Sequence, residues 1–255
     1  MKKFFYDYYD KTTDIDGMYS LPHFIILALF FGGLVFLLYR SRRLTDKQVD
    51  KLYLGITIGV TVCEVVKISI RLYKNQPPND WLPLFYCSLF LFASWFALSK
   101  WEWLRRAGYA YMTMGGVTAS IFYIIYPSTG LAIYPWWHPA PLHGVLYHFA
   151  MCYTGLLLLI KGKYTPTLKD GIYYSVFILL ACVPSYFLNE SLGSNCMFLD
   201  NPYALPIIDW LEKQSHLAYM VVVALAQSVG MYALNYGVYR LILRFINPKR
   251  KVEKS

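Results

Sequence analysis

The sequence predicts an all-α polytopic membrane protein, a seven-transmembrane-helix bundle with its N-terminus outside the cell and its C-terminus in the cytoplasm. Of the 255 residues, 57% are hydrophobic and only 15% are charged. Soluble domains carry about 25% charged residues, and several apolar runs here are long enough to cross the roughly 30 Å hydrocarbon core of a bilayer. Lys and Arg gather in alternate connections between these runs, which orients the chain.

Seven apolar segments are the expected spans. They cover residues 21–39, 51–73, 81–99, 104–126, 142–160, 170–188 and 215–245. Pro83 falls in the first turn of the third span, where a helix tolerates proline. The last span is longer than a bilayer requires, so we expect it to tilt or to emerge into the cytoplasm. Residues 1–20 form an expected extracytoplasmic interfacial segment, and residues 246–255 a basic cytoplasmic tail.

The basic side chains decide the orientation. Connections after the first, third and fifth spans carry Arg40, Arg42, Arg43, Lys47, Lys51, Lys100, Arg105, Arg106, Lys161, Lys163 and Lys169. The positive-inside rule places these connections in the cytoplasm, whereas the loop 127–141 has no basic or acidic side chain except His138. Topology and anionic headgroups thus account for the net charge of +9, without a nucleic-acid partner. We expect the protein to lie in the plasma membrane of a bacterial cell.

The cysteines predict neither a disulfide framework nor a metal site. Four of the five lie within expected spans, and only Cys196 lies in a loop. Their spacing does not match a zinc-binding pattern. We therefore expect no metal and no other cofactor.

The second span contains the most informative charges. Glu64 and Lys67 are three residues apart, so they share one face of a helix, and Arg71 follows one turn later. An ionisable side chain inside a membrane is costly and frequently functional. A structural ion pair and a functional site are both open at this point.

The fifth span carries His148 in an otherwise apolar helix, with Cys152 four residues later on the same face. At a rise of about 1.5 Å per residue, His148, Lys67 and Cys87 each lie roughly 10 Å below the outer ends of their helices, and Glu64 lies a little deeper. We therefore expect a polar cluster in one layer of the bundle interior.

The last outer loop, residues 189–202, reads NESLGSNCMFLDNP. Its turn residues alternate with apolar ones, so it either folds back as a lid over the outer mouth of the bundle or is an ordinary connection. Asn195 in this loop is a further candidate member of the polar cluster.

Several short motifs occur in an informative order: EVVK in the second span, LPLFYC in the third, PLHGVLYH and KGKYTPT around the fifth, and GSNCMFLDNP in the last outer loop. In order and spacing the chain resembles the YwaF-type seven-span membrane proteins, which are similar to the transmembrane protein 164 family of eukaryotic ether-phospholipid acyltransferases. In this resemblance, Glu64, Lys67 and His148 match family positions.

The resemblance implies a lipid-handling protein, but this chain lacks one motif of the family at the start of the third span. Eukaryotic relatives have Pro-Cys-His at the start of the third span, with the cysteine proposed as the acyl-carrying nucleophile, and YwaF-type proteins have Pro-Leu-His. This chain has Pro83, Leu84 and Phe85 there. Cys87, one turn away, is the thiol that would pair with His148 in an acyl-transfer site.

Three functions follow as hypotheses. The leading one is an acyltransferase or lipase-like enzyme in the outer half of the bundle, with His148 and Cys87 as catalytic residues and membrane lipids or another acyl-chain-containing substrate as partners. The second is a transporter or binder that uses Glu64, Lys67 and His148 to hold a substrate or relay protons. The third is a scaffold whose polar cluster only fixes helix packing.

Overall fold

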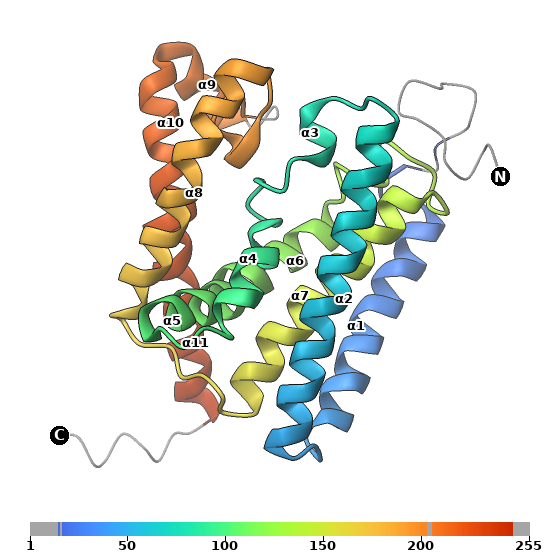
Figure 1. Cartoon of the computed structure of the whole chain (residues 1–255), viewed down its shortest axis with the longest axis vertical. Coiled ribbons are helices and arrows are strands. Elements are labelled where there is room, and N and C mark those ends of the chain that lie inside the picture. Colours follow the sequence, from blue (N-terminus) through green and yellow to red (C-terminus); the bar gives the residue numbers. More distant parts are fainter. Residues whose placement is uncertain (1–14, 16, 203–205, 247–255) are drawn as a thin grey trace. The chain divides into compact units, whose positions relative to one another are not determined.

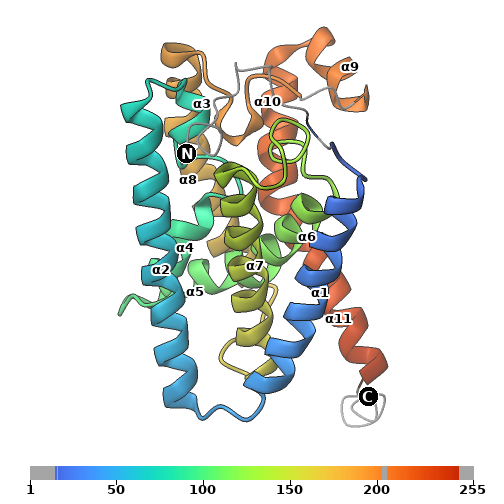
Figure 2. The ribbon, with the colours of Figure 1, turned by 90° about the vertical axis from the view of Figure 1, so that its right-hand side faces the viewer.

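The structure, a computed structural model, describes residues 15, 17–202 and 206–246, and this part of the chain is built from helices without any strand. Figures 1 and 2 show the helices from two directions. Most of the expected N-terminal interfacial segment, residues 1–20, and of the basic tail, residues 246–255, lies outside the described residues. The all-α prediction is confirmed for the described part.

Within the described residues, five helical runs are long and apolar enough to cross a membrane. They are α1 (Leu21–Ser41), α2 (Asp46–Tyr73), α7 (Pro139–Ile160), α8 (Asp170–Leu192) and a last run, His216–Phe245, which α10 (His216–Leu225), the π-helical turn η4 (Ala226–Gly230) and α11 (Met231–Ile246) form together. Only 17% of the most apolar window of α1 is buried. Outward-facing apolar side chains of this kind are what a helix in lipid presents.

The prediction of one continuous helix over residues 81–99 is wrong. The segment instead holds α3 (Pro78–Trp81) and α4 (Leu89–Phe96), joined by non-helical backbone. Leu82 is extended, with ψ of 123°, because the residue before a proline, here Pro83, clashes in the helical region. With 8 residues, α4 is about 12 Å long, well short of the hydrocarbon thickness.

The fourth expected span, residues 104–126, is helical nearly throughout. It consists of α5 (Glu102–Ala110), the π-helical turn η2 (Tyr111–Gly116) and α6 (Val117–Ile125). Its small residues permit close packing, as expected. A Cβ atom at Gly108 would collide with the backbone oxygen of Ala93 on α4, so only glycine allows α4 and α5 to approach this closely.

The chain divides into two compact units. Unit 1 consists of the residues up to Lys74 together with Gly116–Tyr164, and it contains α1, α2, α6 and α7. Unit 2 consists of Asn75–Gly115 and the residues from Thr165 onward, and it contains α3, α4, α5 and all helices from α8 to α11. One helix of unit 2, α9 (Pro206–Gln214), has no counterpart in the predicted set.

The core of unit 1 is built where its helices meet. Its buried members are Phe30, Leu34, Val49, Ile124, Cys152, Tyr153 and Leu157. Around this core, the Ser41 and Tyr153 hydroxyls lie 2.6 Å apart in a buried hydrogen bond, and the Lys161 ammonium donates to the carbonyl of Leu44 at 2.7 Å. These polar contacts fix the turn between α1 and α2 against the end of α7.

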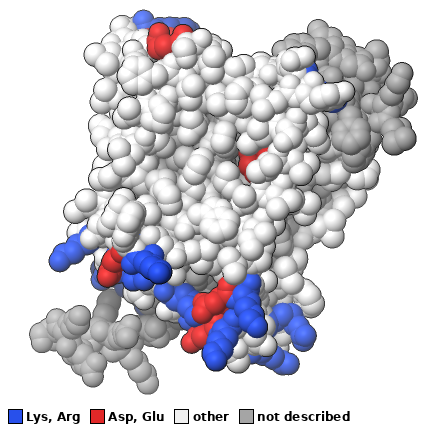
Figure 3. Space-filling model, in the orientation of Figure 1, with Lys and Arg blue, Asp and Glu red and all other residues white. Residues whose placement is uncertain are grey.

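Helix ends follow local sequence chemistry. Thr45 and Gln48 form a reciprocal capping box at the start of α2. His138 caps α7 by accepting a hydrogen bond from the backbone N–H of Ala140 at 3.1 Å. Figure 3 shows charged side chains gathered at the end of unit 1 where α1 is joined to α2, and there Lys163 lies 2.9 Å from Asp50.

Unit 2 is held by a buried ion pair and a group of tyrosines. The Arg106 guanidinium on α5 donates to both carboxylate oxygens of Asp170, at the start of α8, with the bond to Oδ2 at 2.7 Å. The backbone N–H and the hydroxyl of Thr167 also donate to that Oδ2, each at 2.8 Å. Tyr86 and Tyr174 are hydrogen-bonded through their hydroxyls.

Candidate functional site

The predicted pair of Glu64 and Lys67 exists in unit 1, where the Glu64 carboxylate is buried and Lys67 is partly exposed. One oxygen of the Glu64 carboxylate, Oε1, accepts a hydrogen bond from the Lys67 ammonium. The Glu64 side chain is 2% exposed, whereas that of Lys67 is 24% exposed. The lysine therefore reaches from a more open position to a carboxylate that the helices enclose.

A third member of this cluster, His143 on α7, was missed by the sequence analysis. Its Nε2 lies 3.4 Å from the second carboxylate oxygen of Glu64, Oε2, which makes an ion pair whenever the imidazole is protonated. Neither atom has a hydrogen-bond partner. The available signal was the motif PLHGVLYH, which holds two histidines, of which only the second had been considered.

His148 has a defined tautomer because of its backbone partner. Its Nδ1 lies 2.7 Å from the carbonyl oxygen of Gly144, one turn earlier in α7. A carbonyl oxygen only accepts hydrogen bonds, so Nδ1 carries the proton and Nε2 keeps a lone pair. That Nε2 is buried and has no hydrogen-bond partner, which leaves it able to accept a proton or a hydrogen bond from a bound molecule.

Neighbouring aromatic rings fix the orientation of the His148 ring. It stacks on Tyr123 of α6, with ring centroids 3.7 Å apart and an angle of 3° between the planes, and Tyr147 contacts it edge-on. A Cβ atom at Gly144 would collide with the Tyr123 hydroxyl. Glycine at this position thus permits the stacking that orients the imidazole.

His23 in the same unit shows the opposite arrangement. It is fully buried, its Nδ1 accepts from the backbone N–H of Tyr19, and its Nε2 donates to the carbonyl of Ile124, each at 2.9 Å. Both ring nitrogens are therefore occupied within unit 1. His23 has a structural role, which His148 does not share.

Cys87 belongs to unit 2, whereas His148 belongs to unit 1, and their predicted pairing stays a prediction. Cys87 lies in the non-helical segment between α3 and α4, and its backbone carbonyl receives a hydrogen bond from the Tyr111 hydroxyl at 3.5 Å. Within unit 1, the thiol of Cys152 is fully buried in the apolar core. Cysteine thiols surrounded by apolar side chains are inert.

Asn195 also belongs to unit 2, where it organises its own loop. Its side-chain oxygen accepts from the backbone N–H groups of Asp200 and Asn201, at 2.9 and 3.1 Å, and its side-chain nitrogen donates to the carbonyl of Asn201 at 3.0 Å. Both ends of the amide are therefore used within the loop. These bonds favour a structural role over the predicted contact with a substrate.

The loop around Asn195 is anchored at several points. Met197 and Phe198 adopt positive φ angles of 53° and 55°, a conformation that costs L-residues of order 1 kcal/mol or more. The backbone N–H of Met197 donates to the carbonyl of Leu84 at 3.0 Å, and Gln227 donates to the carbonyl of Met197 at 2.8 Å. Of the two readings of this segment, these bonds favour a fixed connection over a moving lid.

Comparison with known protein families gives a match over most of the chain. A sequence model described as the TMEM164 family matches residues 18–234. No curated protein and no solved structure shows a significant match.

Proposed function

Because the chain belongs to the TMEM164 family, we propose that this multi-pass membrane protein binds a lipid ester and transfers or hydrolyses its acyl group. The observation that carries the proposal is the His148 imidazole, whose Nε2 is buried, unpartnered and left as a lone pair by the Gly144 bond. An imidazole held in one tautomer by its other nitrogen is the usual arrangement of a general base.

In the proposed reaction His148 first accepts a proton and then donates it. Its Nε2 takes the proton from the hydroxyl of water or an acceptor alcohol, while that oxygen forms a bond to the ester carbonyl carbon. The bond from this carbon to the original alcohol oxygen then breaks, and the departing oxygen takes the proton from the imidazolium. Histidine bases of this kind contribute about 10²- to 10⁴-fold to a rate.

Glu64, Lys67 and His143 would hold the polar part of the lipid. The cluster combines one carboxylate, one ammonium and one imidazole, and the ammonium carries three hydrogen-bond donors of which Glu64 uses one. A phosphate or ester oxygen is a suitable acceptor for the remaining donors. Positioning contacts of this type contribute to catalysis by fixing the reacting group near the base.

The test measures acyl transfer and release by mass spectrometry, with the purified protein in phospholipid vesicles. We expect His148→Ala to lower the rate at least 100-fold, in line with the loss of a general base. Cys87→Ser and the matched control His216→Ala, which replaces a histidine on α10 of unit 2, should change it less than twofold. Loss of activity in Cys87→Ser with an active His148→Ala would contradict the proposal and point to a thiol mechanism.

A second candidate function rests on the contact between His143 and Glu64. This pair joins α7 to α2, and its attraction depends on protonation of the imidazole, as a proton-coupled binder or transporter requires. Proton-dependent substrate uptake that disappears in Glu64→Gln, without any acyl product, would favour this function. A scaffold would show neither activity.

We also propose that the N-terminus lies outside the plasma membrane of a bacterial cell, that the C-terminus is cytoplasmic, and that the chain crosses the membrane seven times. The Lys and Arg residues after the first, third and fifth spans support this orientation. Seven crossings require the segments from α3 to α6 to enter and leave the membrane between α2 and α7. The turn between α4 and α5 would then be cytoplasmic.

Cysteine labelling in a cysteine-free background tests this topology. Thr129→Cys, in the loop between α6 and α7, should react with an impermeant reagent from outside. Lys100→Cys, in the turn between α4 and α5, should react only after permeabilisation. Outside labelling at Lys100→Cys would instead indicate five crossings, and inside labelling at Thr129→Cys would reverse the orientation.

A further inference from the structure

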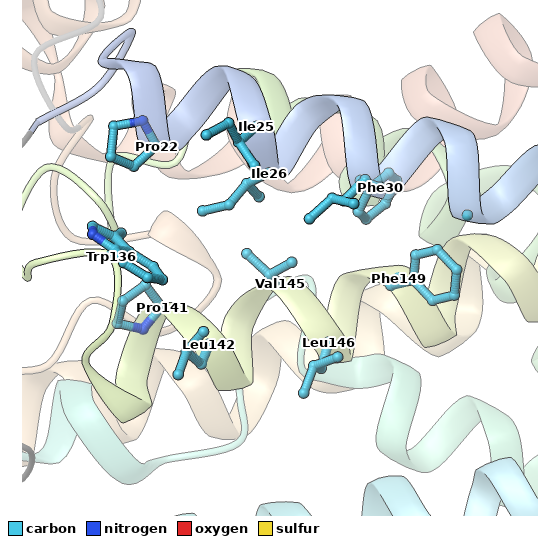
Figure 4. A pocket seen from close by; sticks show the side chains of 12 residues that line it. Pro22, Ile25, Ile26, Phe30, Trp136, Pro141, Leu142, Val145, Leu146 and Phe149 are labelled. Carbon is cyan, nitrogen blue, oxygen red and sulfur yellow. The ribbon is translucent and has the colours of Figure 1, made fainter.

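Unit 1 contains an apolar groove between α1 and α7, here called the α1–α7 groove. Its lining comes from Pro22, Ile25, Ile26, Leu29, Phe30 and Gly33 on α1, from Pro141, Leu142, Val145, Leu146 and Phe149 on α7, and from Trp136. The volume is about 530 Å³, within the range of about 300–1,000 Å³ typical of ligand sites. Figure 4 shows the two helices with their side chains facing one another across it.

Aromatic rings lie near both ends of the groove. Trp136, from the loop before α7, lies between Pro22 and Pro141 at one end (Figure 4). At the other end the rings of Phe30 and Phe149 meet edge to face, with centroids 5.4 Å apart. The groove is thus a bounded site on the surface of unit 1.

Its length matches one leaflet of a bilayer. Pro22 and Gly33 are eleven residues apart on α1, which corresponds to about 16 Å along a helix. Half of a typical hydrocarbon core is about 15 Å. A partner transmembrane helix would need an open face of about 20 residues, which is longer than this groove, whereas the length and the apolar lining fit a single hydrocarbon chain.

The groove is also separate from the polar cluster. Its α7 residues recur at the spacing of one helical face, whereas His143 and Tyr147 project from the opposite face, roughly half a turn away. The lining side chains include no titratable or nucleophilic group. A chain lying in the groove therefore meets no atom that could react with it.

We propose that the α1–α7 groove holds one acyl chain of a resident membrane phospholipid, whose headgroup stays in the interface beside Trp136 and whose tail reaches the other end of the groove, near Phe30, Gly33 and Phe149. This lipid supports the packing of α1 on α7 and is distinct from the lipid ester of the proposed reaction. Trp at the interfacial end agrees with the preference of its amphipathic ring for the headgroup level.

Gly33 provides a selective way to fill the groove. A Cβ atom there would lie 3.5 Å from the Phe149 ring, whereas a Cβ at the neighbouring Gly32 meets nothing within 4 Å. Gly33→Leu therefore places a side chain inside the groove, and Gly32→Leu adds the same side chain outside it. Val145→Trp fills the groove from α7 and serves as a second, independent variant.

The probe is a phosphatidylcholine with a photoreactive diazirine midway along one acyl chain, added to the full-length protein in vesicles. After irradiation and digestion, the wild type and Gly32→Leu should carry label on peptides from both α1 and α7. Gly33→Leu and Val145→Trp should carry at least fivefold less. Equal labelling of Gly33→Leu and Gly32→Leu would mean ordinary contact with bulk lipid and would overturn the proposal.

Two further readouts separate this site from the proposed reaction. His148→Ala should keep the label, and its loss there would overturn the distinction between the two lipids. Adding phosphatidylcholine to delipidated protein in detergent should raise the unfolding temperature of the wild type and of Gly32→Leu, because a ligand of the native state stabilises it. The same increase in Gly33→Leu and Val145→Trp would contradict the proposal.

Discussion

Asp170 and Glu64 are two buried carboxylates with basic partners, and their surroundings differ in one respect. The Asp170 residue is 0% exposed and Glu64 is 1% exposed. Asp170 accepts hydrogen bonds from Arg106 on both of its oxygens and from Thr167 on Oδ2. Glu64 accepts one from Lys67 on Oε1, while Oε2 makes no hydrogen bond and has only the His143 Nε2 atom 3.4 Å away. One carboxylate is saturated by unit 2, and the other keeps capacity within unit 1.

The difference indicates how each carboxylate is used. A buried charge is tolerated when its hydrogen bonds are complete, as at Asp170, and such a group has no capacity left for a ligand. An incomplete shell is costly in an apolar environment and frequently marks a functional site. His23 and His148 repeat this contrast, since only the second leaves a ring nitrogen without a partner.

Breaking the saturated pair should have the largest effect on stability. Arg106→Leu would leave the Asp170 carboxylate buried without its cation, and such a change costs about 3–5 kcal/mol. Chemical unfolding in detergent micelles measures it, with Arg105→Leu on the same helix as the control. A cost below about 1 kcal/mol, equal to that of the control, would show that Thr167 alone satisfies the carboxylate.

Replacing Asn195 should have the next largest effect on stability. Asn195→Ala removes three hydrogen bonds and leaves the backbone N–H groups of Asp200 and Asn201 without their acceptor, which should lower the free energy of unfolding by about 2 kcal/mol. Asn235→Ala is the control, because its amide bonds within its own helix, to Met231. A large rise in substrate KM with unchanged stability would instead restore the substrate-binding role.

The sequence predicted the elements with long-range regularity. Apolar runs identified all five membrane-length helices, and the i, i+3 spacing placed Lys67 on Glu64. The prediction of a continuous helix for the third span was wrong because Pro83 forces an extended conformation on Leu82. This local effect outweighed the apolar composition of the segment. The carbonyls left free there find partners in unit 2, among them the Leu84 oxygen that accepts from Met197, and a sequence does not reveal such partners.

Only part of the candidate site was predictable, because a sequence reveals local spacing but not contacts between distant segments. Local spacing finds Glu64 and Lys67, but the contact between Glu64 and His143 joins residues 79 positions apart on different helices. Likewise, the sequence marks His148 as an unusual buried residue without showing which nitrogen is occupied. The tautomer follows from a side-chain rotamer that reaches the Gly144 carbonyl within α7, and the stacking of the ring depends on Tyr123 of α6.

Glu64→Gln should alter stability much less than Arg106→Leu and alter function more. Glutamine keeps the shape of the side chain and an acceptor oxygen for Lys67, whose side chain is 24% exposed and can reach the interface when it loses the charge pair. We expect a cost of about 1 kcal/mol in unfolding, together with a loss of acyl-transfer or uptake activity. A cost equal to that of Arg106→Leu, about 3–5 kcal/mol, would place Glu64 among the structural groups and favour the scaffold.

The ion pairs of Lys163 with two exposed carboxylates should have the smallest effect on stability. Lys163, outside the membrane-spanning helices, lies 2.9 Å from Asp50 and 3.6 Å from Asp46, whose side chains are 68% and 78% exposed. The hydrogen bond to Asp50 raises the pKa of Lys163 in the folded protein. Water competes for such a pair, so we expect Lys163→Met to cost only about 0.2–1 kcal/mol at low salt, and less at high salt.

The sign of the Lys163 pKa shift fixes the pH window of this effect. The pKa is higher in the folded than in the unfolded state, so folding favours the protonated lysine. The stabilisation is therefore complete below the unfolded-state pKa of about 10.4 and disappears as the pH rises through the folded-state value. Unfolding of the wild type and Lys163→Met at pH near 8 and near 11 should show the full difference at the lower pH and a smaller one at the higher pH, and Lys169→Met controls for loss of one positive charge nearby. A difference of the same size at both pH values would mean that the aliphatic part of Lys163, rather than its charge, stabilises the end of unit 1.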